Sequence, residues 1–310
     1  MPAAARMFLA LLLLPVAVAG RQSPDAASIL AAARTALGGD AALNAVASFT
    51  VSGTLNVNVD AGRTATSSIA VYSQLPDKFV RIRRQDFTNP VGSFTLTEYR
   101  GFNGDDGIQE IVAPGAPFPV VMSGGRVGPV PTTPEEIAAA RQKAIHMAKH
   151  PCIEFALPLF AGLALSGFPL EPTVAASAGS AAEDAVEFKG PDGFVWRLFL
   201  SRSSHLPVRM TWMAKPRVIA TTTSRTVVSS GGQVKSSEGP TSLPTGDPSA
   251  GLADVEWQVV VADYKVADGL NWPHRMTTSY GGLKVDDLQL GKFKINPKID
   301  PAVFTPRKQR

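Results

Sequence analysis

The feature that most constrains this chain is a strict alternation of apolar and polar residues that begins at Phe49. Phe49, Val51, Leu55 and Val57 fall on one side of an extended chain, and polar residues occupy most of the intervening positions. Successive side chains of a β-strand point to opposite faces, so residues 49–59 predict a strand. One face of that strand should meet a core or a ligand, and the other should meet water.

Further strands are predicted along the chain, each bounded by residues that favour turns, such as Pro, Gly, Asn and Asp. Short strands joined by such turns are typical of an antiparallel meander, so the sequence predicts a mainly β fold. The other predicted strands are 68–73, 78–84, 93–99, 107–112, 185–189, 194–201, 208–213, 255–264, 274–280 and 287–295.

Helices are predicted before and between these strands. Apolar residues at helical spacing predict a helix over 28–37, which ends at two glycines. Thr133 precedes a proline and stands three residues before Glu136, a capping-box pattern that predicts a helix to about residue 149. Pro151 should end that helix, and residues 153–165 should form a second helical or irregular segment over the sheet. The helical insertion therefore covers about 133–165.

The two remaining segments are expected to stay outside the core. Residues 1–19 contain Arg6, an apolar run and an Ala-Val-Ala ending, which predict a signal peptide and thus a periplasmic or secreted protein. The apolar run is shorter than the roughly 20 residues that span a bilayer, and no cysteine follows it to carry a lipid anchor. Residues 229–253 are rich in Ser, Gly, Pro and Thr and predict a flexible insertion. Residues 20–310, which include this insertion, are predicted to form a single domain.

Composition excludes several classes of protein. Cys152 is the only cysteine, so no internal disulfide can form and the fold must depend on its hydrophobic core. The formal net charge of +4 becomes +3 without Arg6, which is too small to indicate nucleic-acid binding. Basic residues gather at 81–84 and 307–310. We interpret them as solvated strand and tail ends, with contact to an anionic membrane as the alternative.

Three short segments stand out beside this order of elements. They are 36–43 (ALGGDAAL), 199–207 (FLSRSSHLP) and 292–304 (KFKINPKIDPAVF). Together with the layout, they resemble the outer-membrane lipoprotein-sorting (LolA/LolB-like) carriers. Residues 263–275 (DYKVADGLNWPHR) also resemble a strand-turn-strand unit of exported proteins of this general kind. The resemblance implies an antiparallel sheet curved into an unclosed half-barrel with a few helices packed across it. It also implies a non-catalytic protein that holds acyl chains of a lipid or lipoprotein in an apolar concavity.

A curved sheet has a concave face that its own helices can leave incompletely filled, and such a face offers an apolar site. Burial of ten methylene groups there could contribute on the order of 8 kcal/mol before ordering costs. The alternative is that the same residues pack against one another as a filled core. The candidate ligand-binding residues are Phe49, Val51, Leu55, Val57, Trp196, Leu198, Met210 and Trp212, with Phe155, Leu159, Phe160 and Leu163 as the cover.

Chemistry-bearing residues are few. His146 and His150 have the i, i+4 spacing that lets two imidazoles share a metal, with Glu154 or Cys152 as a third ligand. The zinc-protease pattern places a glutamate after the first histidine, where this chain has Met147. We therefore interpret the histidines as an exposed helix face. Cys152 lacks a Gly-rich turn or an oxyanion donor nearby, so a buried thiol is the simpler interpretation.

Two pairs of neighbouring carboxylates, at 105–106 and 286–287, fall at predicted turns or strand starts. Neighbouring residues of a strand point to opposite faces, so we interpret both pairs as solvated turn acids. The chain also lacks a nucleophile elbow, a Walker loop and a dinucleotide fingerprint. No catalytic residue, metal ligand or cofactor is predicted.

The sequence therefore favours a non-catalytic periplasmic or secreted binding protein for a lipophilic small molecule or an acylated lipoprotein, expected to be a monomer. The alternative is a cell-envelope interaction module with a filled core, in which a sheet edge or the insertion recruits another protein. A metal-dependent hydrolase using His146 and His150 comes third. A cavity of several hundred cubic ångströms under the helices would distinguish the first from the second.

Overall fold

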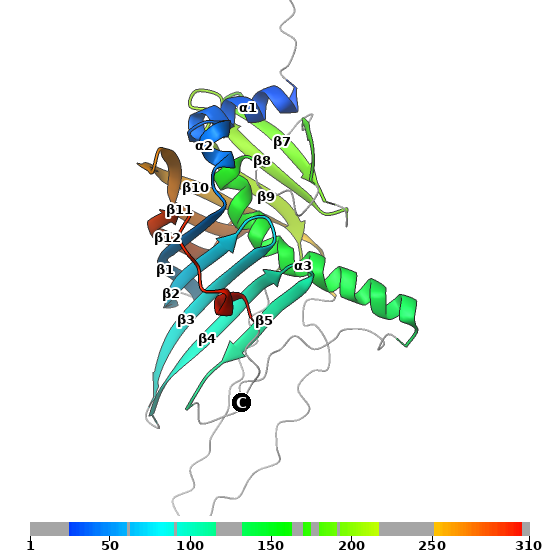
Figure 1. Cartoon of the computed structure of the whole chain (residues 1–310), viewed down its shortest axis with the longest axis vertical. Coiled ribbons are helices and arrows are strands. Elements are labelled where there is room, and N and C mark those ends of the chain that lie inside the picture. The colour runs from blue at the N-terminus through cyan, green and yellow to red at the C-terminus, as the bar shows by residue number, and fades with distance from the viewer. Residues whose placement is uncertain are drawn as a thin grey trace, which may run out of the picture.

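A computed structural model of the chain describes residues 25–60, 63–89, 92–115, 132–162, 170–174, 180–190, 193–216 and 251–305 (Figure 1). The predicted signal peptide, the basic tail at 307–310 and most of the predicted insertion at 229–253 lie outside these residues. Within them, the chain forms one 12-stranded sheet, three α-helices and a short 3-10 helix.

The strands follow one another as two antiparallel meanders. The order across the sheet is β5-β4-β3-β2-β1-β12-β11-β10-β9-β8-β7-β6. The first and last strands pair directly, with Phe49 opposite Ile295, and this pairing joins the two halves. In sequence order the strands are β1 (Ser48–Asp60), β2 (Arg63–Gln74), β3 (Lys78–Asn89), β4 (Gly92–Asn103), β5 (Asp106–Val112), β6 (Glu171–Val174), β7 (Glu183–Lys189), β8 (Val195–Ser201), β9 (Pro207–Ala214), β10 (Val255–Ala267), β11 (Leu270–Tyr280) and β12 (Leu283–Ile295).

The predicted fold class is confirmed. The curved sheet does not close into a barrel, because in the described residues its two edge strands, β5 and β6, do not pair with each other. Each predicted strand is present, and most are longer by a few residues than the alternation indicated. The short edge strand β6 was not predicted, because its four side chains are all exposed and carry no alternation.

Three helices accompany the sheet: α1 (Ala26–Leu37), α2 (Asp40–Asn44) and α3 (Pro134–Phe160). The side chain of Asp25 caps α1 by accepting a hydrogen bond from the Ser28 amide. Gly38 ends α1 with a φ of 130°, a conformation that favours glycine. Helix α2 was not predicted, because a helix of five residues is too short to show a helical repeat of apolar positions.

The predicted start of α3 is confirmed, but its predicted end is wrong. The Thr133 side chain and Glu136 form the reciprocal capping box. The helix then continues through Pro151 and Pro158 to Phe160 as one element. An interior proline costs about 3 kcal/mol. The apolar side chains after Pro151 are buried against the sheet, and their burial offsets that cost. These buried residues are Ile153, Phe155, Ala156, Leu157, Leu159 and Phe160.

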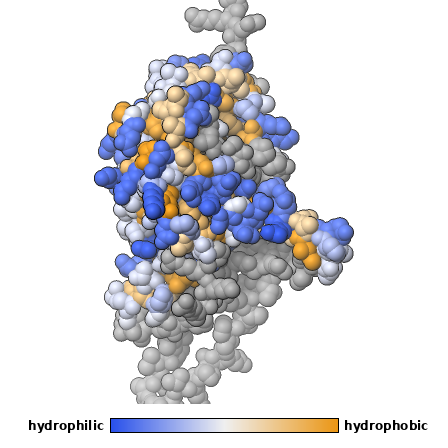
Figure 2. Space-filling model, viewed as in Figure 1, coloured by the Kyte–Doolittle hydropathy of each residue, from blue (hydrophilic) through white to orange (hydrophobic). Residues whose placement is uncertain are grey.

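Hydrophobic residues pack on both faces of the sheet. The main cluster lies on the concave face, where α3 crosses the sheet and contacts β4, β5 and β9 (Figure 1). A smaller cluster lies on the other face of β3 and β4, where Phe304 of the 3-10 helix Pro301–Phe304 packs with Val80, Ile82 and Tyr99. Hydrophilic residues cover much of the visible surface of the described residues, with smaller hydrophobic areas between them (Figure 2). Across the described ranges, no helix combines the length and apolar character needed to cross a membrane.

Candidate ligand-binding cavity

A cavity of about 330 Å³ lies on the concave face of the sheet. Its walls come from β1 to β4, from β10 to β12 and from the middle of α3. Apolar and charged side chains both line it. They are Leu55, Val57, Ile69, Arg81, Arg83, Glu98, Arg100, Pro151, Glu154, Phe155, Val259, Met276, Thr278, Asp286 and Leu288.

The apolar wall results from the register of three strands. Leu55 of β1 lies opposite Leu288 of β12, and Leu288 lies opposite Met276 of β11. Directly paired residues of an antiparallel sheet present their side chains on the same face. These three residues therefore form a continuous apolar row, and Val57 and Val259 line the cavity beside it.

The charged wall comes from β3 and β4. Arg81 lies opposite Arg100, and Arg83 lies opposite Glu98. Glu98 forms an ion pair with Arg100 and a longer one, at 4.0 Å, with Arg83. Alternation along β3 sends Arg81 and Arg83 into the cavity, whereas Arg84 belongs to the other face. Our interpretation of residues 81–84 as a solvated strand end is therefore wrong for Arg81 and Arg83.

The charge environment of Arg81 is unfavourable. Burial lowers the pKa of its guanidinium, and repulsion by Arg100 lowers it further. Glu98, Glu154 and Asp286 oppose that shift from a distance. Among the residues that the structure describes, none donates to, accepts from or forms an ion pair with the Arg81 side chain. A partly buried cation without a direct partner is costly to a fold.

The predicted ligand-binding residues occupy two environments. Leu55, Val57 and Phe155 line the cavity. The other predicted residues that the structure describes are buried in the main hydrophobic cluster without lining the cavity, and Leu163 lies outside the described residues. The buried ones are Phe49, Val51, Leu159, Phe160, Trp196, Leu198, Met210 and Trp212.

Packing explains this division. Trp196 pairs across the strands with Trp212, and Leu198 pairs with Met210. Phe49 stacks on Phe155, with ring centroids 6.2 Å apart. The cavity residues of β2, β3, β4, β10, β11 and β12 were not among the predicted ligand-binding residues. Alternation marked the faces of those strands, but only the long-range pairing of β1 with β12 shows that they surround one space.

The histidines and the cysteine do not form a reactive centre. The buried ring of His150 packs against Phe194, with centroids 4.4 Å apart, so the predicted exposed face is wrong for that residue. His146 contacts the side chain of Gln142. The structure brings together no group of three His, Cys, Asp or Glu residues able to hold a metal within its described ranges. Burial raises the pKa of the Cys152 thiol to about 12, which disfavours the reactive thiolate at neutral pH.

The two carboxylate pairs differ from one another. Asp105 and Asp106 are exposed at a turn, as interpreted from the sequence. In the second pair, Asp286 lines the cavity and Asp287 is buried on the opposite face. The prediction of a solvated turn acid is therefore wrong for Asp287, because β12 begins at Leu283 and places both residues within the strand.

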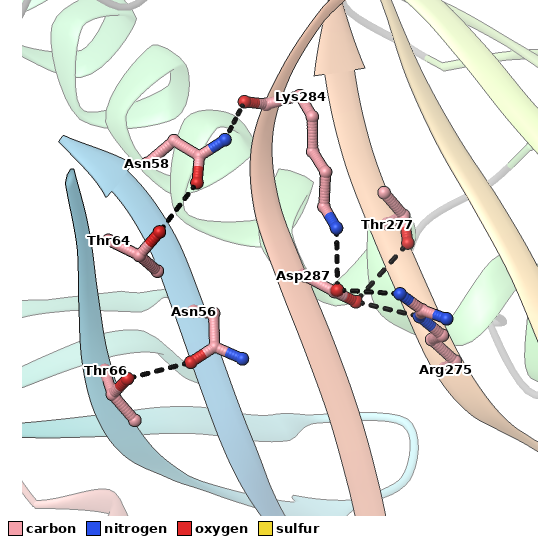
Figure 3. Close-up of polar contacts among 8 residues, drawn as sticks. All are labelled: Asn56, Asn58, Thr64, Thr66, Arg275, Thr277, Lys284 and Asp287. Atoms are coloured by element: carbon pink, nitrogen blue, oxygen red, sulfur yellow. Dashed lines mark hydrogen bonds and ion pairs between the residues drawn. The ribbon is translucent and has the colours of Figure 1, made fainter. Parts of the chain in front are cut away.

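Asp287 anchors a polar cluster on the convex face (Figure 3). Its carboxylate accepts two hydrogen bonds from Arg275, at 3.0 and 2.9 Å, and one from Lys284 at 2.7 Å. The hydrogen bond from Arg275, followed by Lys284, lowers the pKa of Asp287 to about 2. On the same view, Asn56 and Asn58 of β1 bond to Thr66 and Thr64 of β2. The polar side chains at alternate positions of β1 thus hold the convex face together.

No family model and no curated protein matches this sequence. Solved structures do match, among them the following two, each of which covers most of the chain. A LolA superfamily protein from Nitrosomonas europaea has 13% identity and a TM-score of 0.46, with 91% of this chain and 98% of that chain covered. A candidate outer membrane lipoprotein-sorting protein domain from Vibrio parahaemolyticus has 11% identity and a TM-score of 0.42, with 83% and 88% covered. Both descriptions name the group that the short sequence segments resemble, and at these values they assign no ligand to this chain.

Proposed function

We propose that this protein is a non-catalytic binding protein for a lipophilic ligand, which it holds in the cavity beneath α3. The observation that carries the proposal is the apolar row of Leu55, Leu288 and Met276 along one wall of a 330 Å³ cavity. Small-molecule sites are concave, largely apolar and about 300–1,000 Å³ in volume. The cavity also has the size expected from the sequence for a carrier.

The energy available is sufficient for useful affinity. Each methylene group removed from water contributes about 0.8 kcal/mol, so ten groups contribute on the order of 8 kcal/mol before the cost of ordering the chain. A binding free energy of about 8 kcal/mol corresponds to a micromolar dissociation constant, and the ordering cost makes the expected affinity weaker than that. Phe155 of α3 and Val57 of β1 also line the cavity and add apolar surface to the site.

Mutation of adjacent residues on β10 tests the site. Val259 lines the cavity, while Val260 is 38% exposed, and neighbouring strand residues point to opposite faces. Val259→Phe should fill the cavity and weaken binding of dodecan-1-ol at least tenfold. Val260→Phe makes the same change outside the cavity and should leave binding intact. Native mass spectrometry and calorimetry of the mature protein measure both, with circular dichroism as the check on folding.

The cellular part of the proposal rests on the predicted signal peptide at 1–19. We propose a periplasmic or secreted monomer whose ligand is a lipid or the acyl chains of a lipoprotein. Fractionation of cells that produce the full chain, with mass determination of the mature N-terminus, tests the location. A full-length N-terminus in the cytoplasmic fraction would contradict it.

The alternative is an envelope interaction module, favoured by the open edges at β5 and β6 in the described sheet. Unpaired strand edges can accept a strand from another protein. A folded, ligand-free protein that binds no dodecan-1-ol would contradict the carrier proposal and favour this alternative.

A further inference from the structure

The charged wall of the cavity indicates which kind of lipophilic ligand it takes. Arginines and apolar residues are separated by strand. Arg81, Arg83 and Arg100 come from β3 and β4, whereas the apolar row comes from β1, β12 and β11. In the sheet, β2 alone separates β4 and β3 from β1, β12 and β11. The cavity therefore has a cationic end and an apolar end.

The three acidic residues of the cavity equal its three arginines in number, but none of them bonds directly to Arg81. Glu98 is shared by Arg83 and Arg100. Glu154 and Asp286 also line the cavity and attract Arg81 electrostatically, without a hydrogen bond or ion pair to it. Arg81 has no hydrogen bond or ion pair with any described residue. The cationic end thus contains one guanidinium whose donors are not used by the described part of the chain.

The placement of Arg81 is unfavourable without a ligand. It lies directly opposite Arg100 across β3 and β4, and like charges in directly opposed positions destabilise a sheet. Burial adds the cost of removing a cation from water. An anion between the two guanidinium groups would relieve both effects. The planar guanidinium fork also matches the geometry of carboxylate and phosphate oxygens.

We infer that the cavity selects a single-chain amphiphile with a compact anionic head, a carboxylate or a phosphate monoester, which binds at Arg81 and Arg100. Its hydrocarbon chain lies along the apolar row. β3 and β12 are three strand spacings apart, about 14 Å along the sheet, so one chain reaches from the arginines to Leu288. This inference rests on the proposed function, because it requires that an acyl chain enter the cavity.

Matched ligands separate the headgroup from the chain. The mature protein is titrated with dodecanoate, dodecyl phosphate, dodecan-1-ol and dodecylammonium by calorimetry and native mass spectrometry, with the ionic ligands below their micelle concentrations and the alcohol below its solubility limit. Charge-assisted hydrogen bonds predict that the two anions bind about tenfold or more tightly than the alcohol. Inorganic phosphate alone should neither bind nor compete with dodecanoate.

Three variants assign the preference to residues. Arg81→Gln should abolish the preference for the anions while the affinity for dodecan-1-ol stays unchanged. Arg84→Gln removes the same charge from the other face of β3 and should retain the preference. The side chain of Arg100 is 46% exposed, so Arg100→Gln should disturb folding less than Arg81→Gln and provides a second test. It should also reduce the preference.

The outcomes distinguish this inference from the proposed function. Equal affinity for the alcohol and the anions, or tighter binding of dodecylammonium, would refute the inference of an anionic headgroup. The proposed lipophilic site would remain supported. Competition by inorganic phosphate would show that the arginines bind free anions, and it would refute the inference that the ligand is an amphiphile. Binding of none of the four ligands would overturn the headgroup inference and the proposed function together.

Discussion

Removal of the Asp287 carboxylate should destabilise the protein in a pH-dependent way. Hydrogen bonds from Arg275 and Lys284 lower the pKa of Asp287 from 3.8 to about 2. Its side chain is 10% exposed, whereas those of Arg275 and Lys284 are 44% exposed, so solvent screens part of the interaction and the free energy derived from the pKa shift is an upper bound. A difference of about 1.8 pH units, at ~1.4 kcal/mol for each, gives about 2.5 kcal/mol. A carboxylate with a lowered pKa contributes this stability above its unfolded pKa and loses it as the pH falls toward 2.

Urea unfolding of the wild-type protein and Asp287→Asn at two pH values measures this contribution. The variant should be less stable by up to about 2.5 kcal/mol at pH 7, and the gap should shrink by about half at pH 3. Asp254→Asn is the control, because Asp254 and Lys215 form an ion pair in which both side chains are about half exposed. That variant should change stability by less than about 0.5 kcal/mol. A gap for Asp287→Asn that is the same at pH 7 and pH 3 would refute the ion-pair argument.

Two further predictions concern packing. A Cβ at Gly101 would lie 1.9 Å from the carbonyl oxygen of Phe79 on β3, so Gly101→Ala should cost at least about 3 kcal/mol in urea unfolding. Gly251→Ala is the control, because a Cβ at Gly251 would have no atom within 4 Å and should leave stability unchanged. Equal stability of the two variants would contradict the close approach of β3 and β4. Because Cys152 is buried with a pKa of about 12, iodoacetamide should label it at least about 100-fold more slowly in the native than in the unfolded protein at pH 8, as followed by mass spectrometry. Labelling at the same rate in both states would contradict its burial.

The alternation of β1 could be read from the sequence because side-chain direction in a strand is a local property. Phe49, Val51, Leu55 and Val57 are all buried, and Ser52 and Thr54 are exposed. The same local rules failed at Pro151, where the burial of the helix that follows outweighs the preference of proline to end it. Local patterns thus predict the faces of elements better than their ends.

The cationic end of the cavity could not be predicted from local patterns. The strand 78–84 was expected to end at Arg84, which made the arginines a strand end. β3 continues to Asn89, and Arg81 and Arg83 lie in its middle. Their role depends on the register that sets Arg81 against Arg100, and on the contact of β1 with β12 from the opposite end of the chain. Neither the register of β3 and β4 nor the pairing of β1 with β12 can be inferred from residues that are neighbours in the sequence.

The position of the cavity follows from how α3 divides the concave face. Toward its C-terminal end, Leu157, Leu159 and Phe160 are fully buried, and Phe160 packs edge-on against Trp272. Near Phe155 the helix instead faces β3 and β4, whose inward side chains include arginines and a glutamate. Charged groups cannot pack dry against an apolar helix without a large desolvation cost. The concave face is therefore filled where its side chains are aromatic and hollow where they are charged, which places an apolar wall and a cationic wall around the same space.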